Sequence, residues 1–293
     1  MLETGLAVPI GVDDAGAEVV VDCATHGMIL ADVDMGFCPP ANTGDFLRGL
    51  LVAAAAAADP SELQVWVVRP GYTSPEDHAR LQIAGAAPKR KRTTGLGETC
   101  WDNELRAIEP SEFDRDTLVH ALPHVTQVLS GECTRVRDRF ISLITAEKDR
   151  RDRIFSAAGV CDLSTYNERR RQDPSLPSVP RILVHIDYLQ GLVDRAPDDP
   201  GHQVLSSIAH SGRALGIHLQ IATGDPDLVG HVSYLHDLAN YRILLQTEHR
   251  PPAQSWVGRG DEDRPWIQEP GKGLLGYGAG SATTAFSFTA PPR

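Results

Sequence analysis

The order of its apolar segments is the feature of this sequence that most limits its fold. Short apolar or β-branched runs alternate with longer segments of helical periodicity. The strand-like runs occupy residues 27–31, 64–68, 181–187, 217–223 and 241–245, and the helical segments include 45–58, 131–159 and 204–215. Parallel strands need a crossover connection, usually a helix, so this alternation predicts a mainly parallel sheet covered on both faces. A ligand crevice is then expected beyond the carboxyl ends of the strands.

The segment 131–159 has a long amphipathic helical pattern. Its apolar side chains fall mostly on one face, and we expect the charged ones to face solvent. Those charged residues are Arg135, Arg137, Lys148, Arg150 and Arg151. Elsewhere we predict two short strands within residues 6–22, a short helix at 162–172, and a strand end at Pro70-Gly71.

The chain has 39 acidic and 28 basic side chains, which gives a formal net charge of −11. Such a surface repels a phosphate backbone, so broad nucleic-acid binding is disfavoured. The best local candidate for such a contact is the basic run 89–92, which we interpret as a solvated loop tip. Five cysteines without a CxxC pair favour a reducing cytoplasm over a metal centre or a disulfide framework. The longest apolar stretch, 50–58, is too short to span a bilayer, so membrane association would come through a partner.

The length suits one large α/β domain. We therefore expect residues 1–293 to form a single domain. Within it, about 71–120 has no clear period and several Gly and Pro residues, and it predicts an irregular insertion.

Several segments together resemble a known family. Ile182–Asp187 has the form of a Walker B strand, in which a terminal Asp helps to hold Mg²⁺. Arg213–Thr223 reads R-A-L-G-I-H-L-Q-I-A-T, and further matching segments are 9–13, 26–27, 122–125 and 240–243. This ordered set resembles FtsK/SpoIIIE-type ATPases, and most of all the EccC-type motor of type VII secretion. The resemblance implies a three-layer P-loop NTPase (RecA-like) fold that binds ATP and Mg²⁺.

The nucleotide motifs of that family are degenerate here. A phosphate loop needs G-x-x-x-x-G-K-[ST], in which backbone N–H groups and the Lys hold phosphates and the hydroxyl binds Mg²⁺. The resemblance places this loop at 37–44, which reads F-C-P-P-A-N-T-G. Phe37 and Asn42 stand at the glycine positions, Thr43 at the Lys and Gly44 at the Ser/Thr, while Pro39 and Pro40 have no N–H to donate. We expect this loop to bind ATP and Mg²⁺ poorly or not at all.

The residues that would activate water are also changed. By the resemblance, Asp187 is the Walker B acid, and the Glu that should follow it is Tyr188, a poor general base near neutral pH. The sensor-like pair is Thr223-Gly224, where the family has Gln in place of the Gly. The family's Asp-Phe-Lys-Gly-Gly segment is represented by Arg69-Pro70-Gly71-Tyr72. Asp187 is thus interpreted as a relic, and we predict no catalytic residue and no metal ligand.

Other candidate residues have structural interpretations. His185 and His218 lie on predicted strands and are expected to be core or crevice histidines. The glycine-rich segment 271–278 lacks a following helix, so we interpret it as a terminal turn rather than a phosphate loop.

Three functions remain open at this stage. The first is a non-hydrolysing regulatory or docking domain, which contacts other motor-ATPase modules or WXG100-type secretion substrates as the resemblance implies. The second is an active translocase subunit with a non-standard site, in which Arg242 matches a family arginine that reaches a neighbour's phosphate. The third is DNA binding without hydrolysis, which the negative charge disfavours. We favour the first, in the cytoplasm and at the membrane only through a secretion complex.

Overall fold

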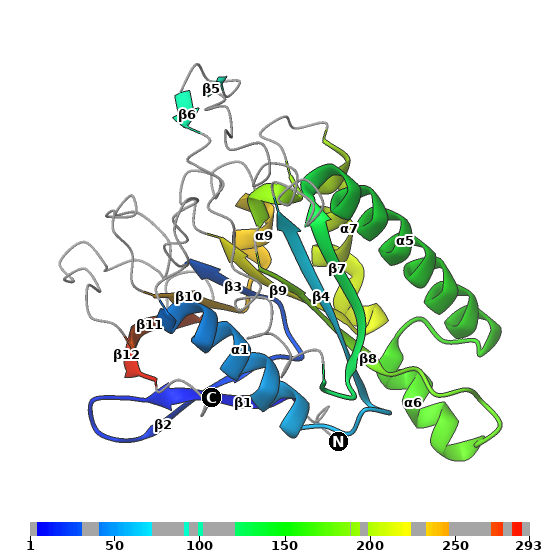
Figure 1. Ribbon diagram of the computed structural model, residues 1–293. Helices are drawn as coiled ribbons and strands as arrows, with labels where there is room; N and C mark the ends of the chain where they lie inside the picture. Colours follow the sequence, from blue (N-terminus) through cyan, green and yellow to red (C-terminus); the bar gives the residue numbers. More distant parts are fainter. Residues whose placement is uncertain are drawn as a thin grey trace.

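The computed structural model describes residues 5–30, 41–71, 91–93, 99–101, 121–187, 189–193, 199–223, 233–245, 271–277 and 283–288. Within these residues, ten strands form one sheet in the order β2-β1-β12-β11-β10-β3-β9-β8-β4-β7 (Figure 1). A separate pair, β5 (Lys91–Thr93) and β6 (Thr99–Trp101), lies in the segment expected to be an insertion. Apart from Gly71, the rest of that segment, with Lys89 and Arg90, is outside the described residues.

One half of the sheet is entirely parallel. It contains β10 (Tyr241–Leu244), β3 (Gly27–Leu30), β9 (Ile217–Thr223), β8 (Arg181–Ile186), β4 (Leu63–Gly71) and β7 (Val125–Glu132). Every residue of β9 is buried, as expected for a parallel strand covered on both faces. The predicted mixed α/β architecture is confirmed. The predicted strand end at Pro70-Gly71 is confirmed, since β4 ends at Gly71, and both residues still pair with β7.

Four antiparallel strands extend this sheet beyond β10. They are β11 (Lys272–Tyr277), β12 (Thr283–Ser287), β1 (Ala7–Val12) and β2 (Glu18–Asp22). The expected pair of strands within 6–22 is therefore confirmed. The expected terminal turn was wrong over 272–277, which form β11: Gly273 pairs with Phe286 of β12, and Gly276 pairs with residues of both β10 and β12. Gly271, at φ 80°, does have turn geometry.

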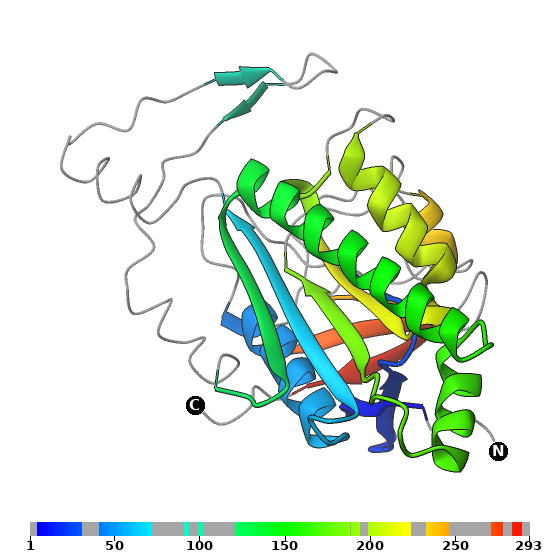
Figure 2. The same cartoon turned by 90° about the vertical axis from the view of Figure 1, so that its right-hand side faces the viewer.

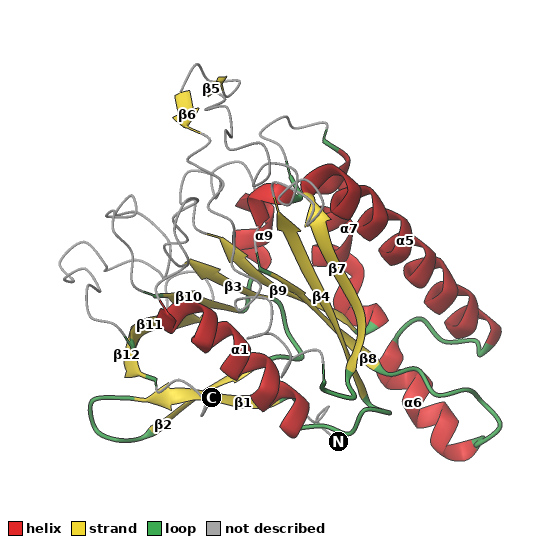
Figure 3. Cartoon of the chain, viewed as in Figure 1, coloured by secondary structure: helices red, strands yellow, loops and turns green. Residues whose placement is uncertain are grey.

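Helices form a layer on each face of the sheet (Figures 1 and 2). On one face, α1 (Ala41–Ala56) packs Phe46 and Leu50 into a core that includes Ile29 and Val65. On the other face lie α5 (Cys133–Ala157), α7 (Pro200–Leu215) and α9 (Ser233–Leu238), whose apolar residues share a second core with alternate residues of the same strands. Figure 3 shows the two helical layers, with α6 (Leu163–Gln172) near the end of α5. Among the described residues, no helix is both long and apolar enough to cross a bilayer.

Arg151 is buried, which overturns its expected place on the solvated face of α5. Its guanidinium donates hydrogen bonds to the carbonyls of Leu215 at 2.6 Å and Pro180 at 2.6 Å, and to the Glu147 carboxylate at 2.7 Å. Leu215 ends α7 and Pro180 precedes β8, so a single side chain ties α5 to both elements. The positive charge also lies where the C-terminal carbonyls of α7 have no intrahelical partner.

Two histidine rings lie close together, tilted by 50°, in the same core. His26, just before β3, and His218 on β9 have ring centroids 6.0 Å apart, and the Nδ1 atom of His26 accepts a hydrogen bond from the Leu219 amide at 3.0 Å. Burial lowers the pKa of His26 to about 4 and that of His218 to about 3, and the nearby charge of Arg213 lowers both further. Both rings are therefore neutral in the folded protein near pH 7, in agreement with the expected core role of His218.

We expect Arg151→Met to lower the free energy of unfolding by about 3 kcal/mol, because it leaves buried carbonyls without a donor. Arg153→Met is the matched control, since Arg153 is exposed on the same helix; its effect should stay within about 0.5 kcal/mol. Urea unfolding followed by circular dichroism measures both changes. Equal midpoints for the two variants would show that the buried guanidinium stabilises nothing.

The histidine pair predicts a loss of stability in mild acid. An unfolded histidine has a pKa of about 6.5, above both folded values, so the unfolded state takes up protons first as the pH falls. The stability is complete above that pKa and declines toward pH 4, with a slope that approaches about 1.4 kcal/mol per pH unit for each histidine. Urea midpoints between pH 7 and 5 should show a shallower slope for His218→Gln and an unchanged slope for His210→Gln, whose side chain is exposed. An unchanged slope in His218→Gln would contradict the assignment.

Candidate functional site

The crevice is expected where the helical connections of the sheet diverge. The chain leaves β3 and returns through α1 on one face, whereas α7 connects β8 to β9 across the other face. The carboxyl ends of β3, β9, β8 and β4 are neighbours in the sheet. In open α/β sheets, ligands bind beyond strand ends at such a point.

The segment expected to be a degenerate phosphate loop leads into α1. Phe37, Pro39 and Pro40 lie outside the described residues, while Asn42, Thr43 and Gly44 lie in the first turn of α1. The helix begins at Ala41 rather than at the expected residue 45, so these three positions have helical backbone. A helix N-terminus that follows a buried strand is the usual place for a bound phosphate. Here the sequence offers no lysine at that turn.

Asp187, which follows β8 directly, has protein partners at both carboxylate oxygens. The Nε atom of Arg69 on β4 donates to Oδ2, and the Nε2 atom of His185 contacts Oδ1. The backbone amide of Asp187 donates to the Val68 carbonyl at 3.0 Å, which fixes the acid beside β4. Sequence reasoning had considered Asp187 and Arg69 separately and had not paired them.

A third strand extends this polar group inward. The Nδ1 atom of His185 lies 3.1 Å from Oε1 of Gln220 on β9, and both side chains are fully buried. Asp187 and an amide oxygen both accept, so the ring donates to both only as an imidazolium. With the Gln220 amide turned so that its NH₂ faces Nδ1, a neutral ring donates to Asp187 alone. Both arrangements leave Asp187 hydrogen-bonded to His185.

The charges around Asp187 favour its ionised form. Burial alone would raise the pKa of its carboxyl, but the positive charge of Arg69, followed by the contact with His185, brings that pKa well below its usual range. The carboxylate is therefore negative at neutral pH, and Arg69 balances its charge within the protein.

The remaining site residues are more dispersed. Tyr188 and Gly224 lie outside the described residues, and Thr223 is buried at the end of β9. Arg242 is buried near the start of β10, with Nη1 3.3 Å and 3.2 Å from the two ring nitrogens of His236. Its Nε and Nη2 atoms have no partner among the described residues. Its proposed reach to a neighbouring subunit stays a prediction.

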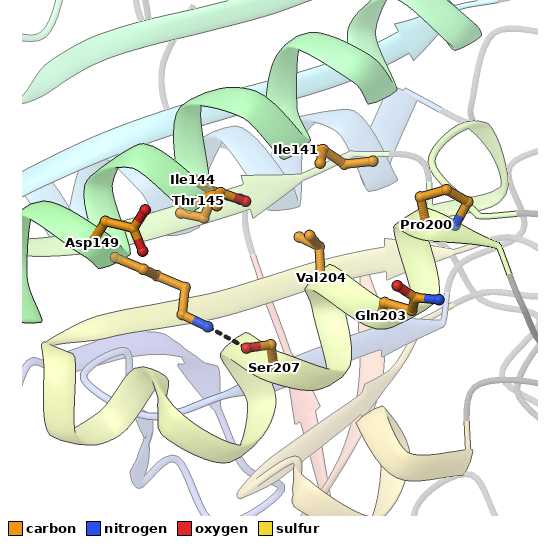
Figure 4. A pocket seen from close by; sticks show the side chains of 9 residues that line it. Ile141, Ile144, Thr145, Asp149, Pro200, Gln203, Val204 and Ser207 are labelled. Atoms are coloured by element: carbon orange, nitrogen blue, oxygen red, sulfur yellow. Dashed lines mark hydrogen bonds between the residues drawn. The ribbon is translucent and has the colours of Figure 1, made fainter.

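A groove between α5 and α7 was not foreseen from the sequence (Figure 4). It has a volume of about 260 Å³ and is lined by Ile141, Ile144, Thr145, Lys148, Asp149, Pro200, Gln203, Val204 and Ser207. Apolar side chains of Ile141 and Val204 face it from the two helices, and the Lys148 ammonium reaches Ser207 across it. The periodicity of each helix indicated its inner face, but not that the two helices would flank one groove.

The two helices are fixed to each other near both ends of the groove. Toward their N-terminal ends, Arg137 pairs with Asp199 at 3.2 Å, and the Asp199 carboxylate also accepts from the Gly201 amide at 2.8 Å as the N-cap of α7. Toward the other end, Arg151 binds the last carbonyl of α7. The groove is therefore preformed rather than dependent on a ligand to bring the helices together.

Comparison with curated proteins finds DNA translocases and secretion ATPases. No family model matches. DNA translocase SftA of Bacillus subtilis is 24% identical over 76% of this chain and 18% of its own length. The ESX-5 secretion system protein EccC5 of Mycobacterium tuberculosis is 28% identical over 46% of this chain and 10% of its own length. The homologues thus include DNA translocases, FtsK among them, and EccC proteins, which confirms the resemblance seen in the sequence. This chain spans less than a fifth of either of these two relatives.

Solved structures agree on the fold. The cytoplasmic domain of the type VII secretion ATPase EccC of Thermomonospora curvata superimposes with a TM-score of 0.67 and 20% identity, over 99% of this chain and 29% of that one. ATPases 2 and 3 of the same EccC, in complex with a signal sequence peptide, give a TM-score of 0.53 at 14% identity, over 99% of this chain and 42% of that one. The fold is that of a P-loop ATPase domain.

Proposed function

We propose that this chain is a non-hydrolysing module of the FtsK/SpoIIIE and EccC type that docks a secretion substrate or regulates neighbouring ATPase modules. The start of α1 is the observation that carries this proposal. The fold retains the phosphate-binding helix after β3, yet Asn42, Thr43 and Gly44 occupy its first turn without a cationic side chain or a hydroxyl at the last position. Phosphoryl transfer depends on charge stabilisation and positioning, and these residues supply neither.

The docking part of the proposal rests on the groove between α5 and α7. An apolar surface between two parallel helices suits one face of an amphipathic helix. Such a helix anchors through residues at i, i+3, i+4 and i+7. The solved EccC structure in complex with a signal sequence peptide makes peptide docking on this fold a reasonable precedent. We assign the groove to the helical tail of a WXG100-type substrate, in the cytoplasm and at the membrane only through a larger assembly.

DNA is the less favoured partner. The DNA translocases among the relatives bring it into consideration. The net charge of −11 opposes it, because affinity for DNA comes largely from cations that neutralise phosphates.

Nucleotide binding tests the proposed loss of hydrolysis. Calorimetric titration with MgATP and MgADP should give no saturable heat, and a phosphate-release assay on the same sample should give no turnover. The reason is that Thr43 cannot replace the charge of the phosphate-binding lysine. Micromolar binding with turnover would overturn this part of the proposal.

Peptide binding tests the groove. Ile141→Glu adds a charge to the apolar surface of the groove. It should weaken the binding of fluorescent WXG100-type tail peptides by about tenfold or more, because an unpaired charge is costly to bury. Ser142→Glu adds the same charge one position along α5, at an exposed site, and should bind as the unchanged protein does. Fluorescence anisotropy compares the three proteins. Equal affinities for all three would remove the groove from the proposal.

A further inference from the structure

The Mg²⁺ implied by the resemblance does not fit the residues around Asp187. Magnesium binds oxygen ligands in near-octahedral geometry and relies on carboxylates to attract it. Both oxygens of Asp187 already contact protein donors, Arg69 and His185. A guanidinium beside the carboxylate also repels a divalent cation.

We propose that Arg69 takes the place of the divalent cation at Asp187, so that an internal ion pair between β4 and β8 excludes metal from the crevice. This inference rests on the proposed loss of hydrolysis, to which it adds a second and separate cause. The altered start of α1 would weaken phosphate binding even in a crevice that could hold metal. The ion pair would exclude metal even if the phosphate loop were restored.

Strand register brings the two charges together. Val68 of β4 stands opposite Ile186 of β8, so the next residue on each strand, Arg69 and Asp187, emerges at the same edge of the sheet. The Val68 carbonyl accepts from the Asp187 amide, which holds this register through the last pair. Because the strands are parallel neighbours, the pair forms as the sheet forms and needs no loop to close it.

Partial burial makes this pair stronger than an ordinary surface ion pair. The side chains of Arg69 and Asp187 are 25% and 19% exposed, so water screens their attraction less than at an open surface. Arg69 is also a permanent cation attached to the same fold, whereas a metal ion must come from solution and lose part of its hydration shell. At physiological metal concentrations, the Arg69 guanidinium therefore occupies the Asp187 carboxylate in preference to a divalent metal ion.

His185 holds the carboxylate from the opposite side. It is fully buried on β8 and contacts both Asp187 and Gln220 of β9. The carboxylate is consequently oriented by β4, β8 and β9 together. Arg69 acts here as a positioning residue for the Asp187 carboxylate. Its removal should free the Oδ2 atom of Asp187, while His185 keeps Oδ1 in place.

Binding of Mn²⁺, without nucleotide, tests this inference. Mn²⁺ is a paramagnetic substitute for Mg²⁺ that electron paramagnetic resonance detects directly. The unchanged protein and Arg69→Lys should show no saturable binding at millimolar Mn²⁺. Arg69→Gln should bind Mn²⁺ at least about tenfold more tightly, and its melting temperature should rise with added Mn²⁺. The double variant Arg69→Gln/Asp187→Asn should lose both effects, which identifies Asp187 as the ligand.

Two results would overturn the inference. One is saturable Mn²⁺ binding by the unchanged protein that Asp187→Asn abolishes. The other is a folded Arg69→Gln that binds no Mn²⁺. If Arg69→Gln does not fold, the first of these results, saturable Mn²⁺ binding by the unchanged protein that Asp187→Asn abolishes, still overturns the inference. The assay contains no nucleotide, so a failure here is distinct from a failure of the proposed function, which would appear as ATP turnover.

Discussion

The parallel pairing of β8 with β4 on one side and β9 on the other is the constraint on which the site depends. It places Arg69 and Asp187 at the ends of neighbouring strands and sets His185 of β8 opposite Gln220 of β9, and so brings together residues far apart in the chain. Arg69, Asp187 and Gln220 are distant from one another in sequence, and strand pairing joins them. A change in the register of β8 by one residue would move His185 from one buried face of the sheet to the other and would disperse the whole group. The contacts among these polar side chains are thus a consequence of the hydrophobic pattern that fixes the positions of the strands.

A second constraint acts on the helical layer. The guanidinium of Arg151 replaces the hydrogen-bond partners that the end of α7 and the start of β8 would otherwise lack. The same guanidinium also binds the Glu147 carboxylate. Burial alone would raise the pKa of the Glu147 carboxyl, but the hydrogen bonds from Arg150 and Arg151 lower that pKa below its usual value. A buried cation without such partners would be strongly destabilising. The groove between α5 and α7 therefore depends on ionic contacts beside it as much as on its apolar lining.

The sequence predicted what depends on local pattern and missed what depends on distant partners. The strands at β3, β8 and β9 were found because runs such as Ile182–Ile186 are almost entirely apolar, with His185 the one polar residue in that run. The strand β7 was missed because it lies at the sheet edge, where polar and small residues dilute the pattern. Arg151 was misplaced because helical periodicity cannot tell a solvated charge from one that meets carbonyls of another element. The pair of Arg69 and Asp187 was missed for a similar reason, since 118 residues separate its members and only the register joins them.

The crevice and the groove are joined by one short element, η1 (Leu189–Gly191), which follows Asp187. Gly191 approaches Pro70 of β4 so closely that a side chain there would clash: a Cβ atom would lie 2.4 Å from the Pro70 Cβ. Next along the chain, the Leu192 carbonyl packs against Gly201 in the first turn of α7, where an added Cβ would come within 2.2 Å. Pro70 is the neighbour of Arg69, and Gly201 is capped by Asp199, the partner of Arg137 at one end of the groove. The chain segment that follows Asp187 is thus close-packed against β4 on one side and against the first turn of α7 on the other, so the end of β8 and one wall of the groove are built from a single stretch of chain.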